Sequence, residues 1–509
     1  MPDWRPVRRV LTLGEVTLAA AASVAGYWEL YRAQRDLFLN GVPPHNPYAF
    51  PRLDSNFLTA LEALDRYWVA TTGVLVVFGY AVVRSRSSGW RRMAWFPLGL
   101  GAVGLLVALP ARPGLSIDAL SYLSHGWIAA APGGNPYLTA SAEVGSTPYG
   151  QLLFAEGWLP VHGVSPYGAL WTHVERLAFA ISGGDIGRGL LALKVVVVLA
   201  VGVSTLLIWL IARQVRPGWE LTAALAFSWS PLVVVEFAME GHNDAVAIAF
   251  TLLGLWAAVT NRAFWAVLGL GLGALTKITP AVFAVPVLIL LVRRRAGWSS
   301  LVGRLAAGVG VAAALAWLLY RRFWAASATL DGLRAGSVPY PSWSPAGWLG
   351  AWFGAPMEGA PDYRPGLVLA AVLIMVVAVV SWQRTTRGLM VACGSIAVAA
   401  MALTPAYWPW YAALPVAVLA ARSTWVAMAQ VLVLTIGSRI AAPYGDLFVI
   451  GVVPFERAMQ LSTLWGVDVP VALCLLMAVG SVVVRKLRAD GSDAHGDGTP
   501  TPTITPRRR

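Results

Sequence analysis

The stretch VVVVLAVGVSTLLIWLIA, residues 195–212, is the clearest indication of the fold class because it contains no charged side chain. A helix that crosses a bilayer needs about 20 mostly apolar residues, and it satisfies its own backbone hydrogen bonds. Further apolar runs occur at 243–260, 278–292 and 365–382. The sequence therefore predicts a chain that crosses a membrane repeatedly as α-helices.

The composition supports the same fold class across all 509 residues. Hydrophobic residues make up 57% of the chain and charged residues 12%, with a mean hydropathy of +0.64. Soluble domains carry about 25% charged residues, so a soluble fold would expose far too much apolar surface. Counting the apolar runs predicts an all-α polytopic membrane protein with about fourteen transmembrane helices. The first run has no small-residue cleavage site after it, and we expect a retained helix there.

The net charge of +13 would suggest nucleic-acid binding in a soluble protein. No large soluble domain carries a basic stripe here, so we expect no nucleic-acid partner. The arginines fall between apolar runs instead, where positive charge keeps a loop in the cytoplasm and contacts lipid headgroups. Cys393 and Cys474 both lie within apolar runs, which excludes a cysteine metal cluster and a disulfide framework.

The distribution of arginine predicts the orientation of the helices. With the N-terminus in the cytoplasm, the short Arg-rich connections, such as 84–92, 213–216 and 293–304, also lie inside. The segments then expected outside are 32–67, 112–187, 237–243, 321–364, 404–411 and 439–465. We therefore predict a multi-pass protein of the cell membrane with both termini in the cytoplasm and any active site on the extracytoplasmic side.

Three parts of the chain differ in character. Residues 1–92 supply two additional N-terminal transmembrane helices joined by an outer loop, and residues 93–484 form a transmembrane core that contains the polar segments. Residues 485–509 are rich in Asp, Gly, Thr and Pro, which predicts a disordered cytoplasmic tail. No clear internal repeat is visible, which argues against an inverted-repeat transporter.

The first polar segment is SIDALSYLSHG, residues 116–126. Asp118, Tyr122 and His125 are spaced i, i+4 and i+7, so on a helix they share one face. An aspartate is costly near hydrocarbon and tends to persist there for function. The alternative is a helix N-cap, in which Ser116 or Asp118 caps the helix that begins here.

The long outer loop contains GGNPY (133–137), TPYG (147–150) and SPYGALW (165–171). Turns of this kind present aromatic rings such as Tyr137 and Tyr167. Such rings suit a sugar-binding or lipid-headgroup surface. The alternative is an aromatic belt at the bilayer interface.

The densest polar segment is EFAMEGHND, residues 236–244. Its side chains Glu236, Glu240, His242, Asn243 and Asp244 would be expensive in contact with lipid, so they face a water-filled cavity or pair internally. His, Asp and Glu could also bind a divalent metal, although nothing in the spacing fixes a coordination geometry. The alternative is a polar network that joins two helices.

Cations and aromatic residues mark two further segments. Lys277 lies at an apparent outer helix junction, where it could bind a phosphate or simply reach the membrane interface. The segment TPAYWPWY, 404–411, has two prolines among four aromatic residues, including Trp410 and Tyr411, and predicts a rigid aromatic hairpin. Arg334, in loop 321–364, breaks the charge bias and could contact a substrate phosphate or lipid headgroups.

Together these segments resemble the bacterial polyprenyl-phosphate-mannose-dependent α-(1→6)-mannosyltransferases, which are GT-C membrane glycosyltransferases of lipoglycan synthesis. The resemblance covers about residues 95–480. The segments that carry it are 118–126, 135–137, 165–171, 241–244, Lys277 and 409–411. One departure is Ala169, where the family often has proline, and residues 1–90 are not aligned with the family.

The resemblance implies a GT-C-like catalytic core at 93–484, with long extracytoplasmic loops, that transfers a hexose such as mannose. The donor would be a polyprenyl-phosphate sugar, the acceptor a glycan or glycolipid, and the transfer inverting. Asp118 would act as general base or orient the acceptor hydroxyl, whereas Lys277 and Arg334 would stabilise the leaving phosphate. The remaining residues expected to bind substrate are Tyr122, His125, Asn135, Tyr137, Tyr167, Glu240, His242, Asn243, Asp244, Trp410 and Tyr411.

Other functions stay open at this point. A transporter or flippase of a lipid-linked sugar would show broken helices and ionisable groups near the middle of the membrane. A non-catalytic scaffold would leave the acidic residues beside lipid without a reason to persist. A related enzyme could use arabinose or glucose. No cofactor is indicated with certainty, and a divalent cation, the acceptor, the linkage, the oligomeric state and the role of residues 1–92 are left undecided.

Overall fold

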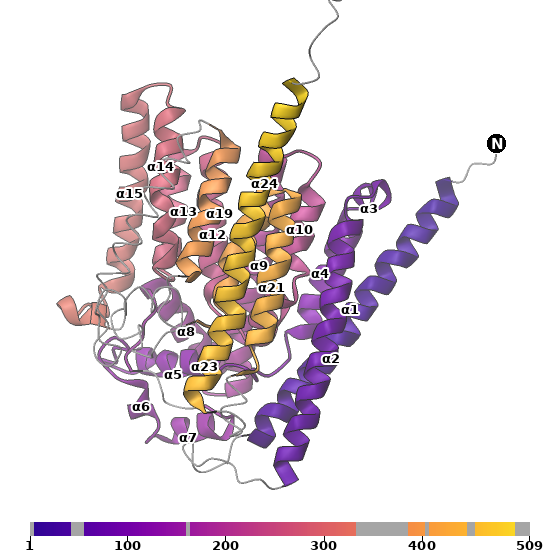
Figure 1. Cartoon of the computed structure of the whole chain (residues 1–509). Coiled ribbons are helices and arrows are strands. Elements are labelled where there is room, and N and C mark those ends of the chain that lie inside the picture. The colour runs from indigo at the N-terminus through magenta and orange to yellow at the C-terminus, as the bar shows by residue number, and fades with distance from the viewer. Residues whose placement is uncertain are drawn as a thin grey trace, which may run out of the picture.

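The computed structural model describes residues 5–41, 55–158, 163–331, 385–402, 407–444 and 454–493. Every regular element in these ranges is helical, and none of them contains a strand. The predicted all-α membrane fold is therefore confirmed. The helices form an elongated bundle with a cap of short helices at one end (Figure 1).

An N-terminal hairpin lies along the side of the bundle (Figure 1). It consists of α1 (Arg5–Gly41) and α2 (Ser55–Arg84), which pack along each other. Ion pairs join the two helices at separate levels: Arg84 binds both carboxylate oxygens of Glu15, and Arg66 lies 2.7 Å from Asp36. Both helices are long and apolar enough to span a membrane.

The bundle continues through helices on both sides of the long helix α9 (Ile186–Val215). The elements of its first half are α3 (Ser88–Arg92), α4 (Trp95–Ala108), α9 (Ile186–Val215), α10 (Glu220–Ser228), α11 (Pro231–Val233), the π-helix η1 (Val234–Met239), α12 (Asp244–Val259) and α13 (Ala263–Ala274). Those of its second half are η2 (Thr279–Phe283), α14 (Ala284–Arg293), α15 (Trp298–Tyr320), α19 (Thr386–Ala402), η4 (Pro409–Ala412), α20 (Ala413–Arg422), α21 (Trp425–Ala441), α23 (Phe455–Thr463), η5 (Leu464–Asp468) and α24 (Val469–Asp493).

Five of the described helices are long and apolar enough to cross a membrane. A sixth candidate is a broken span, in which Glu220–Ser228 and Pro231–Met239 meet at 43°. Six shorter apolar helices of 10–17 residues add to the bundle. The predicted number of about fourteen spans stays a prediction, because the run 365–382 lies outside the described residues.

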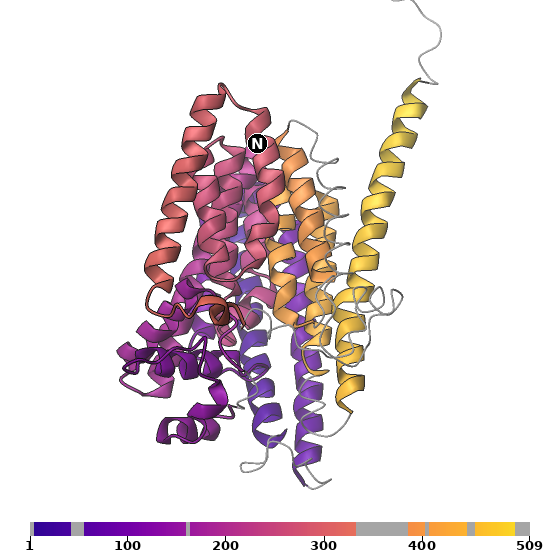
Figure 2. The same cartoon turned by 90° about the vertical axis from the view of Figure 1, so that its left-hand side faces the viewer.

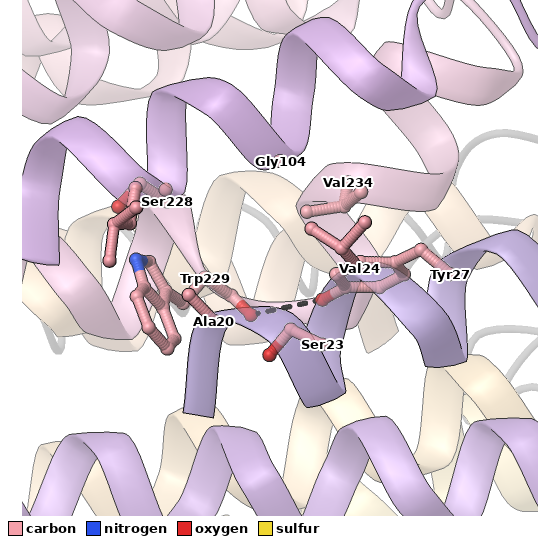
Figure 3. Close-up of a pocket in the computed structure, with 10 residues that line it drawn as sticks. Ala20, Ser23, Val24, Tyr27, Gly104, Ser228, Trp229 and Val234 are labelled. Atoms are coloured by element: carbon pink, nitrogen blue, oxygen red, sulfur yellow. Dashed lines mark hydrogen bonds between the residues drawn. The ribbon is translucent and has the colours of Figure 1, made fainter. Parts of the chain in front are cut away.

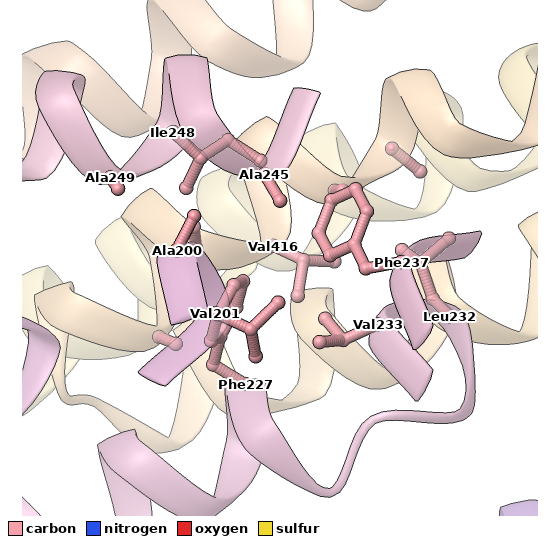
Figure 4. Packing of buried hydrophobic residues seen from close by; sticks show 14 of the residues in the cluster. Ala200, Val201, Phe227, Leu232, Val233, Phe237, Ala245, Ile248, Ala249 and Val416 are labelled. Atoms are coloured by element: carbon pink, nitrogen blue, oxygen red, sulfur yellow. The ribbon is translucent and has the colours of Figure 1, made fainter. Parts of the chain in front are cut away.

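Small residues allow the central helices to approach closely. Ala200 and Val201 of α9, Phe227 of α10, Phe237 of η1 and Ile248 of α12 meet in one fully or nearly buried cluster (Figure 4). This core fixes the ends of α9, η1 and α12 relative to one another, and those ends carry the polar residues described below.

The hairpin meets the core at a small cavity between α1, α4 and the end of α10 (Figure 3). Ala20, Gly101 and Trp229 are among the residues that line it. At its edge, the Tyr27 hydroxyl donates a hydrogen bond of 3.2 Å to the carbonyl of Trp229. The hairpin is thus attached to the core through a directed bond as well as through apolar contacts.

The cap is built from α5 (Asp118–Ala130), α6 (Ser141–Val144), α7 (Pro148–Ala155), α8 (Ala169–Ser182) and the 3₁₀ turn η3 (Ala326–Leu330). It lies at the end of the bundle opposite the start of α1 and the end of α24 (Figures 1 and 2). Helices α5 and α8 cross closely at Gly126, where an added Cβ would lie 2.4 Å from the carbonyl oxygen of Glu175. The long loop predicted at 112–187 is therefore an ordered helical cap wherever it is described.

Candidate active site

Asp118 is the first residue of α5. Its backbone N–H donates to Ser116 Oγ at 3.1 Å, and Ile117 occupies the N-cap position. The Asp118 side chain is therefore not the cap of its own helix. The Asp118 side chain is 12% exposed, whereas His242 beside it is fully buried, and a helix N-terminus favours a carboxylate at this position.

The imidazole of His242 lies beside Asp118. Its Nδ1 atom is 3.5 Å from Asp118 Oδ2, and its Nε2 atom is 3.2 Å from Glu236 Oε2. Trp410 stacks on the ring with a centroid distance of 3.8 Å and an interplanar angle of 20°. Trp410 thus covers one face of the His242 ring, and a carboxylate lies within ion-pair distance of each ring nitrogen, although neither nitrogen has a hydrogen-bond partner among the described residues.

Lys277 and Asp244 form the second half of the cluster. The Lys277 ammonium donates to both Asp244 carboxylate oxygens at 2.9 Å and lies 4.8 Å from the centre of the Tyr411 ring. Burial is the largest single influence and lowers the pKa of Lys277, but Asp244, Tyr411 and Asp118 together outweigh it, so the pKa lies above its ordinary value. Asp118 also contributes to this field, which places both carboxylates within electrostatic reach of one cation.

Glu240 holds the loop that leads to Asp118. Its carboxylate accepts hydrogen bonds of 3.1 Å from the backbone N–H groups of Gly114, Leu115 and Ser116, and it is fully buried. Nearby, the ammonium of Lys194 donates to the carbonyl of Ala111 at the start of the same loop. This geometry fits a role in fixing the loop better than the predicted contact with substrate.

The turn that carries these residues depends on Gly241. Its φ of +82° lies in the left-handed region, which side chains rarely adopt. An added Cβ would also lie 3.0 Å from Lys194 Cγ. Glycine therefore allows η1 to end and α12 to begin with His242 and Asp244 in one cluster.

Aromatic rings form the wall below the cluster. The Tyr122 ring meets Tyr167 and Trp171 edge to face, with centroid distances of 5.1 Å in both pairs. The Tyr122 hydroxyl accepts a long bond of 3.5 Å from the backbone N–H of Asn243. Burial, followed by the nearby Asp118 charge, raises the pKa of Tyr122 and of Tyr167, so both hydroxyls stay neutral.

His125 faces a different set of partners. Its Nε2 atom is 2.9 Å from Ser141 Oγ in α6, and its Nδ1 atom is 3.6 Å from Glu175 Oε1 in α8. All three residues are fully buried, and burial raises the pKa of Glu175. Seven residues of helix separate His125 from Asp118 by about 10.5 Å along the axis. The spacing suggested that His125 would lie beside Asp118. Although the two residues share a helix face, this distance keeps His125 away from the cluster.

Asn135 and Tyr137 join the cap to α15. The Asn135 amide donates to the Phe323 carbonyl at 2.8 Å, and its Oδ1 accepts from the Tyr137 N–H at 3.0 Å. Tyr137 bonds Thr172 at 2.9 Å and lies in a small apolar cluster with Phe323. These contacts describe a docking turn, and substrate binding by the two residues stays a prediction. Arg334 lies outside the described residues.

Sequence reasoning assigned no role to Arg439 or Lys194. Both are charged residues at the ends of apolar runs, and each is fully or nearly buried. A single charged residue beside a long apolar run was the sequence feature that could have identified each of them. The partners of Arg439 and Lys194 become visible only in the folded chain. Within the described ranges, no group of three or more His, Cys, Asp or Glu side chains is arranged to hold a metal ion.

Two family models match the chain across this cluster. The model for the alpha-(1->6)-mannopyranosyltransferase N-terminal domain matches residues 40–294, and the model for glycosyltransferase family 87 matches residues 185–405. Asp118 lies in the first match alone, whereas His242, Asp244 and Lys277 lie in both. No curated protein and no solved structure matches the chain.

Proposed function

The chain belongs to the alpha-(1->6)-mannopyranosyltransferase family, and from that premise we propose that it transfers mannose from a polyprenyl-phosphate donor to a glycan or glycolipid hydroxyl. The reaction would take place at the extracytoplasmic face of the cell membrane. Both family models are those of glycosyltransferases, which supports sugar transfer by this membrane protein. The donor, the acceptor and the membrane face are our proposal.

One observation supports this reaction most directly: the side chains of Asp118 and Lys277 are 12% and 18% exposed, whereas His242 and Glu236 beside them are buried. Asp118 would accept the proton of the acceptor hydroxyl as its oxygen attacks the anomeric carbon. General base catalysis of this kind contributes about 10²–10⁴-fold. The bond from the anomeric carbon to the phosphate oxygen breaks, and attack from the opposite side inverts the configuration.

Lys277 suits the leaving phosphate. A lysine ammonium has three donors, and Asp244 uses two of them, so one stays available for a phosphate oxygen. Charge developing on the leaving group is best stabilised by donors that are already in place. Arg334 remains a sequence-based candidate for the same phosphate.

The sugar itself would lie near Asn243 and Tyr411. Both polar atoms of the Asn243 amide are buried and lack a hydrogen-bond partner within the described part of the chain. A sugar hydroxyl would satisfy them, since unpaired buried polar groups are costly. Trp410 is 7% exposed and covered by His242, so Tyr411 is the better candidate for stacking on the sugar.

Transfer in membranes tests the proposal. Radiolabelled polyprenyl-phosphate mannose would serve as donor and an α-(1→6)-mannan oligosaccharide as acceptor, with wild type compared with Asp118→Asn. We expect wild type to form the product and the folded variant to lose at least about 10²-fold in rate. A folded Asp118→Asn variant with normal turnover would remove Asp118 from the mechanism. A membrane-impermeant acceptor in vesicles of known orientation identifies the face.

The broken span at 43° keeps a lipid-linked sugar transporter as the second candidate, because such proteins use discontinuous helices. The same vesicles separate the two functions. A transporter would move labelled donor between leaflets without any glycosidic product, whereas a transferase would yield elongated acceptor.

A further inference from the structure

Three ionisable side chains form a continuous line behind Asp118. His242 lies 3.5 Å from Asp118 and 3.2 Å from Glu236, and the Arg439 guanidinium binds the other carboxylate oxygen of Glu236. His242 and Arg439 are fully buried, and Glu236 is 1% exposed. We call this line the charge chain.

The charge chain joins segments that are far apart in the sequence. Asp118 begins α5, Glu236 lies in the π-helix η1, and Arg439 lies near the end of α21. The backbone N–H of His242 donates to the carbonyl of Glu236 at 3.1 Å, which folds the turn back onto η1. Short π-helical segments often occur at functional sites, where the extra residue redirects side chains.

The His242 ring lies between two carboxylates. Its Nδ1 atom faces Asp118 and its Nε2 atom faces Glu236 within ion-pair distance, although neither contact has the geometry of a hydrogen bond. Trp410 stacks on the ring with a centroid distance of 3.8 Å and covers one of its faces. The position of the ring therefore depends on the packing of Trp410 and on the two carboxylates.

The N-terminal hairpin closes the far end of the charge chain. The Tyr67 hydroxyl of α2 donates to the backbone carbonyl of Arg439 at 2.9 Å. Tyr67 is fully buried, and the Tyr27 hydroxyl of α1 also lies within electrostatic reach of the guanidinium. The hairpin thus shields Arg439, where lipid or water would otherwise compete for its charge.

We propose that His242, Glu236 and Arg439 are positioning residues that hold the Asp118 carboxylate in place for proton transfer, and that the N-terminal hairpin completes this arrangement by burying Arg439. The catalytic part rests on the proposed function, because it takes Asp118 as the base. The contacts of His242 do not depend on that function. Helices α1 and α2 thereby gain a role in catalysis through Arg439.

The test removes the inner ion pair without leaving a charge behind. Glu236→Leu combined with Arg439→Met replaces the pair by apolar side chains, a change that is often neutral or stabilising for folding. The matched control is Thr435→Val, which removes a 3.1 Å hydroxyl contact to Ser230 between the same two segments, one turn from Arg439.

We expect the double variant to unfold within a few degrees of wild type but to lose at least about tenfold in kcat, since a displacement of about 1 Å at a reacting group can cost 10²-fold. KM for the donor should change by less than about threefold, because the pair does not contact substrate. Thr435→Val should keep wild-type kcat. A folded double variant with wild-type kcat would show that the pair is merely structural.

Nitrogen-15 histidine spectra give a readout that needs no turnover. The six histidines are few enough to assign His242 by its loss in His242→Gln. We expect a displaced Nε2 signal in the Glu236→Leu/Arg439→Met variant but not in Thr435→Val, because Nε2 lies 3.2 Å from Glu236. An unchanged Nε2 signal in the double variant would overturn the charge chain at any transfer rate. If wild type transfers no sugar, the proposed function fails. The spectra then still test whether Glu236 and Arg439 position the His242 ring.

Discussion

The ammonium nitrogen of Lys277 lies 2.9 Å from each carboxylate oxygen of Asp244. Asp244 is the first residue of α12, and Lys277 follows α13, so the pair joins the adjacent ends of two helices that pack together. Their side chains are 12% and 18% exposed. A cation held this firmly needs little reorganisation to receive a phosphate, which is the property that electrostatic catalysis requires.

Removing Lys277 should damage catalysis in two ways. Lys277→Met loses the cation and leaves Asp244 to repel the donor phosphate, so we expect kcat/KM to fall by about 10²–10³-fold. Lys277→Met combined with Asp244→Asn removes the repulsion as well and should recover part of that loss. Steady-state transfer with varied donor measures both. Equal losses in the single and double variants would contradict a phosphate site at Lys277.

Removing the Glu240 carboxylate should loosen the loop before Asp118. The backbone N–H groups of three residues now donate to the two carboxylate oxygens of Glu240. Glu240→Gln has only one side-chain oxygen that can accept, so the variant should lose roughly 1–3 kcal/mol of stability. Hydrogen exchange of the Leu115 and Ser116 amides should become faster, and kcat should fall.

The control for Glu240 is Glu143→Gln, which affects a carboxylate that accepts one backbone N–H at the start of α6 on the protein surface. Its exchange pattern around residues 114–116 should match wild type. Unchanged exchange of Leu115 and Ser116 in Glu240→Gln would show that the carboxylate does not hold the loop.

His125 should matter for stability rather than turnover. His125→Ala loses the bond to Ser141 and leaves the buried Glu175 carboxyl without its nearest basic partner, so we expect a loss of roughly 1–3 kcal/mol. The fraction that stays folded should transfer sugar at the wild-type rate. Thermal unfolding in detergent and kcat per folded protein separate the two effects. A raised KM in fully folded protein would return His125 to the substrate site.

Sequence patterns predicted the helical bundle because apolar runs of membrane length have few alternatives in lipid. They also identified Asp118, His242, Asp244 and Lys277, since polar residues beside such runs are costly and stand out. The structure brings these four into one cluster. For this part of the site, local sequence signals were sufficient.

The pairing of charges could not be predicted in the same way. Arg439 lies 203 residues after its partner Glu236, and no spacing rule connects them. Helix periodicity placed His125 with Asp118 on one face, but it carries no information on distance along the axis or on the neighbouring helix α8. Such contacts depend on how helices pack, which the order of apolar and polar residues does not specify.

Gly241 offers the last test, because it combines a left-handed conformation with a crowded site. Gly241→Ala should cost about 1–3 kcal/mol for strained backbone, and its Cβ would press on Lys194 beneath the loop that leads to Asp118. The matched control is Gly133→Ala, where φ is +68° but nothing lies within 4 Å of the added Cβ. Both variants should lose stability, whereas Gly241→Ala alone should lose at least about tenfold in transfer rate. Similar rates in the two folded variants would mean that this turn does not need its close packing to orient His242 and Asp118.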